Sequence, residues 1–376
     1  MQTGDSMVKS PVTLHDIAQA LNISIGTVHR ALHDSRDVSA ATKAKVLRTA
    51  KALGYRPNLA ARYLSSKKSL RVSVNTLRGT TSFWDEVRAG IREEAGSAPL
   101  ENVELDFKTY ANLGDVQEEI FEAAIREKVD GIITFPSHPK TFRPWIRRAT
   151  RARIPVVCAV TDAPDSGRLG LVAIDTLASG SIAADLMGRF IGQQEGCVAI
   201  TLFDTAITEH AQKSDAFESV LRSFYPRLRL LPPVEDHGVA EEAYSKCRAL
   251  FEEHPGLKGI YVTTEGSIPV LQAARDAGVL NRVTIITTDL FSDLVPHIRS
   301  GVVAATIYQR PRTQGRMAFR VLRAHLTEGE VPSSQVTLAP HLVMRGNLDF
   351  FLRQHAKETF RDNASRNGDE LHSDIA

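Results

Sequence analysis

The sequence has few of the features that mark a secreted, membrane-bound or disulfide-stabilised protein. Cysteine occurs only three times in 376 residues, at Cys158, Cys197 and Cys247, with no CxxC pair and no metal-ligand spacing. An odd, scattered set of thiols predicts a reduced compartment without a disulfide framework. Residues 1–10 are polar and lack the apolar core of a signal peptide, and no run approaches the roughly 18 apolar residues of a membrane helix. We therefore expect a cytoplasmic protein that does not contact a membrane.

Catalytic motifs are also absent. No G-x-S-x-G, P-loop or G-x-G-x-x-G follows a predicted strand, and the histidines of residues 70–350 show no HxH or HExxH spacing in strand-end loops. The acidic pairs Glu93-Glu94 and Glu118-Glu119 fall on predicted helices, where they are most simply solvated faces. These absences predict a protein that is not an enzyme and that carries neither a cofactor nor a metal.

Charge is divided unevenly along the chain. The net charge is only +2, but residues 1–70 contain 11 Lys/Arg against 4 Asp/Glu, whereas the remainder contains 35 against 40. A basic N-terminal segment on a mildly acidic body favours contact between that segment and a polyanion, although basic tails are common.

The basic segment has the pattern of a helix-turn-helix unit. Thr13, with Asp16 three residues later, predicts a capped first helix, and apolar residues then recur at helical spacing up to Leu21. Ser24 is a good N-cap for a second helix over 25–33. A third helix from Ser39 to Gly54 carries its apolar side chains on one face, at Val46, Ala50 and Leu53.

The pattern of apolar and polar residues changes after Pro57. The hexapeptide 59–64 is compatible with a helix but is too short to be stable alone, so it is a candidate for folding on binding. From residue 70 onward, apolar strands alternate with amphipathic helices, which predicts parallel sheets covered by helices on both faces. Some 280 residues of this alternation suit two doubly wound lobes, with ligands bound beyond the carboxyl ends of the strands.

Two stretches of sequence allow a family to be named. The segments VTLHDIAQALNISIGTVHRAL, VSAATKAKV and LGYRPNLAARYL resemble the N-terminal signature of the LacI/GalR family of transcription regulators, collinearly over about 60 residues. The rest of the chain, to about residue 345, resembles the family's ligand domain, which shares its fold with periplasmic sugar-binding proteins.

The resemblance implies a fold class and a division into domains. The class is α/β with a small all-α N-terminal domain, in which a helix-turn-helix headpiece and hinge join two lobes of the periplasmic binding protein type I kind. The implied segments are a disordered N-terminus (1–11), a DNA-binding domain (12–57), a hinge helix and linker (58–69), an effector-binding and dimerisation domain (70–350) and a disordered tail (351–376).

The resemblance also implies which residues contact DNA. They are Thr13, Ser24, Ile25, Gly26, Thr27, His29, Arg30, Asn58 and Leu64. Arg30 can donate a bidentate pair to guanine, while Ile25 and Gly26 offer only methyl contact and close approach. His29 departs from the serine usual at its position. Leu64 matches a leucine that relatives insert into the minor groove; the alternative is a linker residue that packs on the body.

The implied effector site lies at strand ends. Its candidates are Phe83, Trp84, Phe135, Asp162, Asp175, Lys213, His237, Thr264, Asp289 and Gln309. An aromatic ring at Phe83 or Trp84 would stack on a sugar face, unless both rings belong to the core. Asp289 and Gln309 would bind hydroxyl groups, and the alternative for Asp289 is an N-cap. Lys213 replaces the usual arginine and Thr264 the usual asparagine, so we expect a ligand unlike those of the best-known members.

Together these features predict a regulator, expected to be a repressor, of genes for carbohydrate uptake or catabolism. It would bind a near-palindromic double-stranded DNA operator as a homodimer or higher oligomer, and a sugar or sugar derivative would modulate its affinity. The alternative is a non-sugar effector, a purine or phosphorylated metabolite, acting as corepressor. Two rival classes fit less well: a transport binding protein has no use for residues 13–64, and an architectural DNA-binding protein has no need of a ligand domain.

Overall fold

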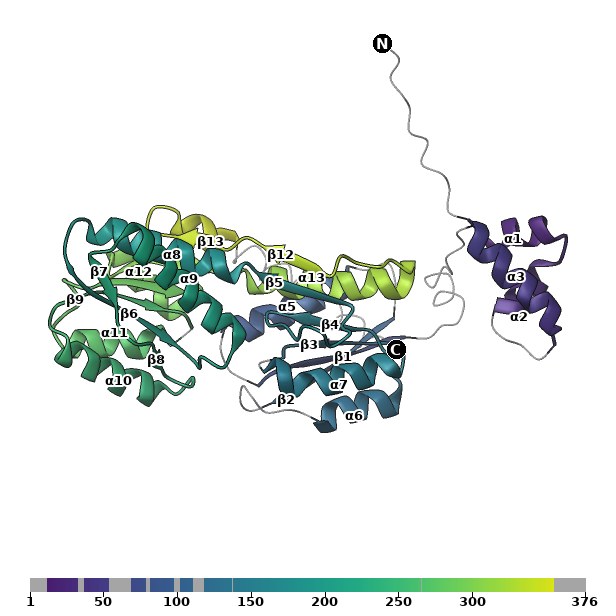
Figure 1. The fold of residues 1–376 in the computed structure, drawn as a ribbon, viewed down its shortest axis with the longest axis horizontal. Helices are drawn as coiled ribbons and strands as arrows, with labels where there is room; N and C mark the ends of the chain where they lie inside the picture. The colour runs from purple at the N-terminus through teal and green to yellow at the C-terminus, as the bar shows by residue number, and fades with distance from the viewer. Residues whose placement is uncertain are drawn as a thin grey trace, which may run out of the picture. The chain divides into compact units, whose positions relative to one another are not determined.

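The computed structural model describes residues 12–32, 37–53, 69–78, 82–97, 102–110, 118–136, 138–264 and 266–354. The chain divides into two compact units, residues 1–68 with 323–331 and residues 69–322 with 332–376. The helices and strands of both units are labelled in Figure 1.

The described residues between 12 and 53 of the N-terminal unit form the helices α1 (Leu14–Leu21), α2 (Ile25–Leu32) and α3 (Ala40–Leu53). Both predicted caps are present. Thr13 and Asp16 form a full capping box, and the Ser24 hydroxyl accepts a hydrogen bond from the Thr27 amide at 3.1 Å. Asn22 joins the first two helices in the left-handed conformation at φ 51°. Local hydrogen bonds therefore fix the turn between α1 and α2.

A small apolar core holds these helices together. Its buried members are Ile17, Ala18, Val28, Ala31, Val38, Val46 and Ala50. The expectation that Leu53 belongs to this face was wrong, because its side chain is 41% exposed at the last residue of α3. So few buried side chains give a core of modest stability.

The second unit contains two lobes, each built on a sheet. The sheet of the first lobe has the strand order β12-β5-β4-β3-β1-β2, and all its strands run parallel (Figure 1). Its strands are β1 (Leu70–Leu77), β2 (Val103–Tyr110), β3 (Gly131–Thr134), β4 (Val156–Ala159), β5 (Gly170–Ile174) and β12 (Gln335–Leu338). The helices of this lobe are α5 (Ser82–Gly96), α6 (Glu118–Glu127), α7 (Pro139–Arg151) and α13 (Pro311–Arg323).

The second lobe has the order β13-β11-β10-β9-β6-β7, with β8 paired to β6. Its strands are β6 (Gly196–Leu202), β7 (Leu228–Leu230), β8 (Val234–Glu235), β9 (Leu257–Val262), β10 (Thr284–Thr288), β11 (Val303–Tyr308) and β13 (His341–Val343). The helices are α8 (Thr176–Ile191), α9 (Thr208–Phe224), α10 (Ala240–Glu253), α11 (Ser267–Asp276) and α12 (Val295–Ser300). Separate apolar clusters lie on its two faces, one with α8 and α9 and one with α10 and α11.

The chain passes between the lobes three times, after β5, after β11 and after β12. The predicted architecture of two doubly wound lobes is therefore confirmed. Because the parallel strands of each sheet end at one edge, the loops that follow them collect there and form the natural place for a ligand.

Helices α5 and α13 cross at very close range in the first lobe. A Cβ atom added at Gly90 would lie 2.0 Å from the Arg312 carbonyl oxygen, and one at Gly315 would lie 2.1 Å from the Val87 carbonyl oxygen. Ion pairs flank the crossing: Arg312 contacts Glu86 at 3.0 Å and Glu93 at 2.8 Å. Glycine is therefore required at this crossing by the approach of the two backbones.

The ordered body extends slightly beyond the predicted boundary at residue 350. Residues 348–354 are helical, and Leu348 and Phe351 belong to the core of the second lobe. Among the described residues, no helix is long and apolar enough to span a membrane.

Candidate DNA-binding and effector sites

One face of α2 is exposed and polar. Ser24, Gly26, His29 and Arg30 are exposed, and the Ile25 side chain is 47% exposed although it is apolar. The opposite face, with Val28 and Ala31, is buried in the three-helix core. The packing of α2 thus leaves exposed the face that carries the residues predicted to read DNA.

Gly26 is not required by the fold of this unit. Among the described residues, a Cβ atom at this position would have two neighbours within 4 Å, the Arg30 guanidinium and the Ser24 hydroxyl, each at 3.8 Å. Glycine also lowers helix stability by about 1 kcal/mol relative to alanine. The described surroundings leave room for a side chain at this position, and close approach of Gly26 to DNA stays a prediction.

The hydroxyl groups of the predicted DNA contacts take part in local caps. The Thr13 hydroxyl donates to Asp16 Oδ2 at 2.8 Å, and the hydroxyls of Ser24 and Thr27 lie 2.9 Å apart. Contacts of these residues with phosphates stay predictions. Asn58 and Leu64 lie outside the described residues.

Three predicted effector residues meet in the second lobe. The Lys213 ammonium, on α9, donates to Gln309 Oε1 at 2.9 Å, and Gln309 Nε2 donates to Asp289 Oδ2 at 2.6 Å. The backbone amide of Gln309 also donates a hydrogen bond to Asp289 Oδ1 at 3.0 Å. Asp289 follows β10, Gln309 follows β11, and Asp289 adopts a left-handed φ of 67°. Residues up to 96 positions apart are thereby joined at the strand ends, as the sequence predicts.

Burial affects the ionisation of the charged side chains in this cluster of Lys213, Gln309 and Asp289. Lys213 and Asp289 are each 3% exposed. Burial lowers the pKa of Lys213, while Asp289 and Glu209 act in the opposite direction. The N-cap alternative for Asp289 does not apply, because its carboxylate accepts hydrogen bonds from Gln309 and the N-cap position of the next helical segment is Phe291.

The predicted aromatic platform is buried. Phe83 and Trp84, on the first turn of α5, are each 8% exposed, and Phe135 after β3 is 1% exposed. Trp84 packs edge-on against both other rings, with centroids 5.1 Å from Phe83 and 5.0 Å from Phe135. This geometry shows a packing role for all three rings, and contact of Phe83 or Trp84 with an effector stays a prediction.

The other candidates have local partners. Asp162 forms a bidentate ion pair with Arg168, with Nη2 and Oδ2 at 2.9 Å. Asp175 caps α8 by accepting from the Ala178 amide at 2.8 Å. The Thr264 hydroxyl accepts from the Gly266 amide at 3.2 Å, and His237 lies 3.0 Å from Glu242. Each of these residues therefore has a local structural partner, through an ion pair at Asp162 and His237, a helix cap at Asp175 and a turn hydrogen bond at Thr264.

Two carboxylates that the sequence analysis did not name lie among these strand ends. Glu209 is one helical turn before Lys213 on α9, and its Oε2 atom is buried without a hydrogen-bond partner among the described residues. Asp236, after β8, is 1% exposed, and its Oδ2 atom is likewise buried without a hydrogen-bond partner among the described residues. The spacing of four residues between Glu209 and Lys213 was the signal available in the sequence.

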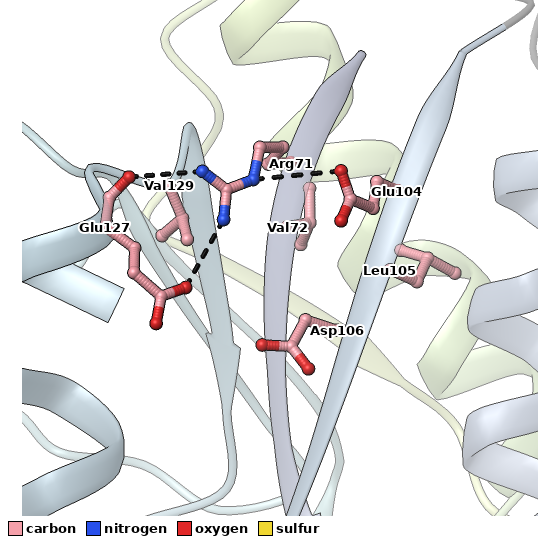
Figure 2. A pocket seen from close by; sticks show the side chains of 7 residues that line it. All are labelled: Arg71, Val72, Glu104, Leu105, Asp106, Glu127 and Val129. Carbon is pink, nitrogen blue, oxygen red and sulfur yellow. Dashed lines mark hydrogen bonds and ion pairs between the residues drawn. The ribbon is translucent and has the colours of Figure 1, made fainter. Parts of the chain in front are cut away.

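A separate depression of about 290 Å³ lies at the opposite ends of the strands. It is lined by residues at the starts of β1 and β2 and before β3 (Figure 2). Arg71 sits between Glu127, at 3.3 Å, and Glu104, at 3.7 Å, so its charge is already neutralised. Within the described ranges no group of three or more His, Cys, Asp or Glu residues is arranged to hold a metal.

Comparisons with known proteins agree with this architecture. A model of bacterial regulatory proteins of the lacI family matches residues 13–58, and a model of a periplasmic binding protein domain matches residues 72–330, more than half of the chain. Catabolite control protein A of Priestia megaterium is 27% identical over 341 residues, covering 88% of this chain and 97% of the relative. Catabolite control protein A of Staphylococcus aureus (strain N315) is 24% identical over 346 residues, covering 89% and 98%.

Solved structures support the fold of the body. GanP, a glucose-galactose binding protein from Geobacillus stearothermophilus, matches with a TM-score of 0.69 and 23% identity, covering 75% of this chain and 99% of that one. A solute binding protein from Agrobacterium vitis with bound D-fucose matches with a TM-score of 0.70 and 23% identity, covering 74% and 97%. At this identity the likeness concerns the fold. The chain belongs to the LacI family of bacterial regulatory proteins, non-enzymatic transcription regulators that join a DNA-binding helix-turn-helix domain to a periplasmic binding protein domain.

Proposed function

We propose that this regulator is a repressor that binds a near-palindromic operator as a homodimer in the cytoplasm. The observation that carries the proposal is the exposed face of α2, where Arg30 and Gly26 lie opposite a fully packed apolar face. A short helix presented in this way fits the major groove, and two copies related by a two-fold axis fit two half-sites.

The proposed effector is a sugar or sugar derivative, and the regulated genes serve carbohydrate uptake or catabolism. Support comes from the Lys213–Gln309–Asp289 chain, which places a cation, an amide and a carboxylate together at strand ends. Polar groups of these kinds bind hydroxyl groups well, since each offers two or more donors or acceptors. The sugar ligands named for the solved structures point to the same class.

The proposed mechanism is a shift between two conformations of the body. A sugar that binds better to the state with low DNA affinity acts as an inducer, because a ligand moves an equilibrium only by its differential affinity. Residues 58–69 would transmit the change, with Leu64 as the minor-groove wedge.

A second candidate is a non-sugar effector, a purine or phosphorylated metabolite, acting as a corepressor. The observation that favours it is the pair of departures in the site, Lys213 in place of the usual arginine and Thr264 in place of the usual asparagine. A corepressor would tighten the complex with operator DNA, whereas an inducer would weaken it.

The test begins with selection of the operator from random DNA by the full-length protein. Thermal shift against sugars, sugar acids, polyols and nucleosides then identifies the effector, since a ligand stabilises the folded state that binds it. The thermal shift should shrink in Asp289→Ala, and the exposed Asp215→Ala on α9 serves as the control. A nucleoside or phosphorylated compound as the strongest stabiliser would favour the second candidate.

A further inference from the structure

Glu209 forms a contact between the two lobes. It lies on the first turn of α9, in the second lobe, and its Oε1 atom accepts a hydrogen bond at 3.1 Å from the backbone amide of Asp162. Asp162 follows β4, in the first lobe. The two residues are 47 positions apart, so this bond exists only when the lobes are close together.

The partner of Glu209 is firmly held. Arg168 binds both carboxylate oxygens of Asp162, and its Nη1 atom donates to the Ser334 carbonyl oxygen at 2.6 Å. Ser334 directly precedes β12, the strand from which the chain crosses to the second lobe. The amide of Asp162 is therefore presented from a rigid loop.

The other oxygen of Glu209 has no hydrogen-bond partner among the described residues, although it is buried. Lys213 lies one turn along the same helix, but its ammonium group donates to Gln309. A buried carboxylate oxygen without a hydrogen-bond donor lowers the stability of the folded protein, because it has lost its hydrogen bonds with water and forms none with the protein. A ligand that brings a donor to this atom would remove the cost.

The charges around Glu209 disfavour an anion. Asp289 and Asp162 are carboxylates, and the two nearby cations, Lys213 and Arg168, already have partners. His210 accepts a hydrogen bond at Nδ1 from the Phe203 amide, and burial lowers its pKa to about 3, so its ring is neutral. Burial raises the pKa of the Cys158 thiol to about 12, so this group is neutral too.

Resting on the proposed function, we propose that Glu209 is a further effector-binding and lobe-closing residue. Its Oε1 atom holds the first lobe close through the hydrogen bond from the Asp162 amide, and its Oε2 atom accepts a hydrogen bond from a hydroxyl or ammonium group of the effector. The site therefore selects an uncharged or cationic effector over its phosphorylated or carboxylated counterpart.

This role predicts a dependence of affinity on pH. Burial raises the pKa of Glu209 to about 7, against the opposing effects of its hydrogen bonds with its own amide and that of Asp162 and of the Lys213 charge. An ionised carboxylate accepts a hydrogen bond more strongly than a protonated one. Effector affinity should therefore increase as the pH rises through 7.

The test compares matched ligands on the full-length protein. D-galactose, D-glucose and D-arabinose are measured beside galactosamine, glucosamine, galacturonate and the hexose 6-phosphates, by thermal shift and calorimetry from pH 5.5 to 8.5. We expect a neutral or amino sugar to bind at least tenfold more tightly than its anionic counterpart. In Glu209→Gln that affinity should fall about tenfold and lose its pH dependence, whereas Glu218→Gln, the same change on the exposed face of α9, should behave as wild type.

Tighter binding of an anionic member, no binding of any neutral or amino member, or an unaltered pH profile in Glu209→Gln would overturn the proposal. Galactose and galactosamine separate the hydroxyl and ammonium forms of the ligand. Operator binding without ligand is measured in the same samples. Loss of sequence selectivity there would refute the regulator proposal separately.

Discussion

The strongest prediction concerns the electrostatic coupling between Lys213 and Asp289. Both side chains are 3% exposed and are joined through Gln309. Lys213→Met removes the ammonium group and leaves the carboxylates of Asp289 and Glu209 without their buried cation. Asp289→Asn removes one of these carboxylates and leaves the shape of the site nearly unchanged.

The magnitude follows from burial. Removal of one partner of a buried charge pair costs about 3–5 kcal/mol, because the other charge is left uncompensated. We expect the lower end, about 3 kcal/mol, for Lys213→Met, since burial already lowers the pKa of this lysine. The double variant lacks both the Lys213 ammonium and the Asp289 carboxylate, so no charge of this pair is left buried without its partner. Its loss of stability should therefore be about 2 kcal/mol smaller than the sum of the single losses.

Urea unfolding of the ligand-free protein, followed by far-UV circular dichroism, gives the four free energies of unfolding for the cycle. The exposed pair Arg248 and Glu252 on α10, 2.6 Å apart, provides the control cycle and should show coupling below about 1 kcal/mol. Additive losses in Lys213→Met and Asp289→Asn, within about 0.5 kcal/mol, would refute the idea that these two charges stabilise each other.

Three further predictions follow from glycine positions and from Glu209. Gly90→Ala should cost at least about 2 kcal/mol in the free energy of unfolding, because its Cβ atom would meet the Arg312 carbonyl oxygen. Gly96→Ala on the same helix would place its Cβ atom more than 4 Å from the described residues around it, and it should be neutral or stabilising. Gly26→Ala should raise the thermal midpoint slightly but weaken operator binding on the order of tenfold; unchanged affinity in an anisotropy titration would remove Gly26 from the interface. Because the folded state holds the Glu209 proton up to a pH of about 7, against 4.5 ordinarily, wild-type stability should fall relative to Glu209→Gln as the pH rises from 5 to 8. The difference is about 3 kcal/mol, or on the order of 5 °C in the midpoint, and parallel pH profiles of the two proteins would contradict it.

Local signals made the N-terminal helices and most strands predictable. Thr13 with Asp16 and Ser24 with Thr27 form hydrogen bonds within three residues, so their caps can be recognised from sequence. The alternation of apolar and amphipathic segments likewise predicted the parallel sheets. Strands β7, β8, β11, β12 and β13 were not predicted. All of them except β11 have four residues or fewer, and β12 and β13 pair with strands distant in sequence.

The candidate effector site was only partly predictable. Lys213, Asp289 and Gln309 follow strands or lie on the next helix, so their meeting was expected from the fold class. The contact of Glu209 with Asp162 depends on how close the two lobes lie, and no local pattern records that distance. The burial of Trp84 depends in the same way on Phe135, which is 51 residues away in sequence.

The most direct test of the central claim is the affinity of the full-length protein for its selected operator with and without the sugar that stabilises it. Fluorescence anisotropy at physiological salt should give binding at least about 1,000-fold tighter than to scrambled DNA. The sugar should weaken that binding by tenfold or more, and Arg30→Ala should lose about 1–3 kcal/mol of discrimination. Equal affinity for operator and scrambled DNA, or an operator affinity that the stabilising sugar leaves unchanged, would contradict a sugar-controlled repressor.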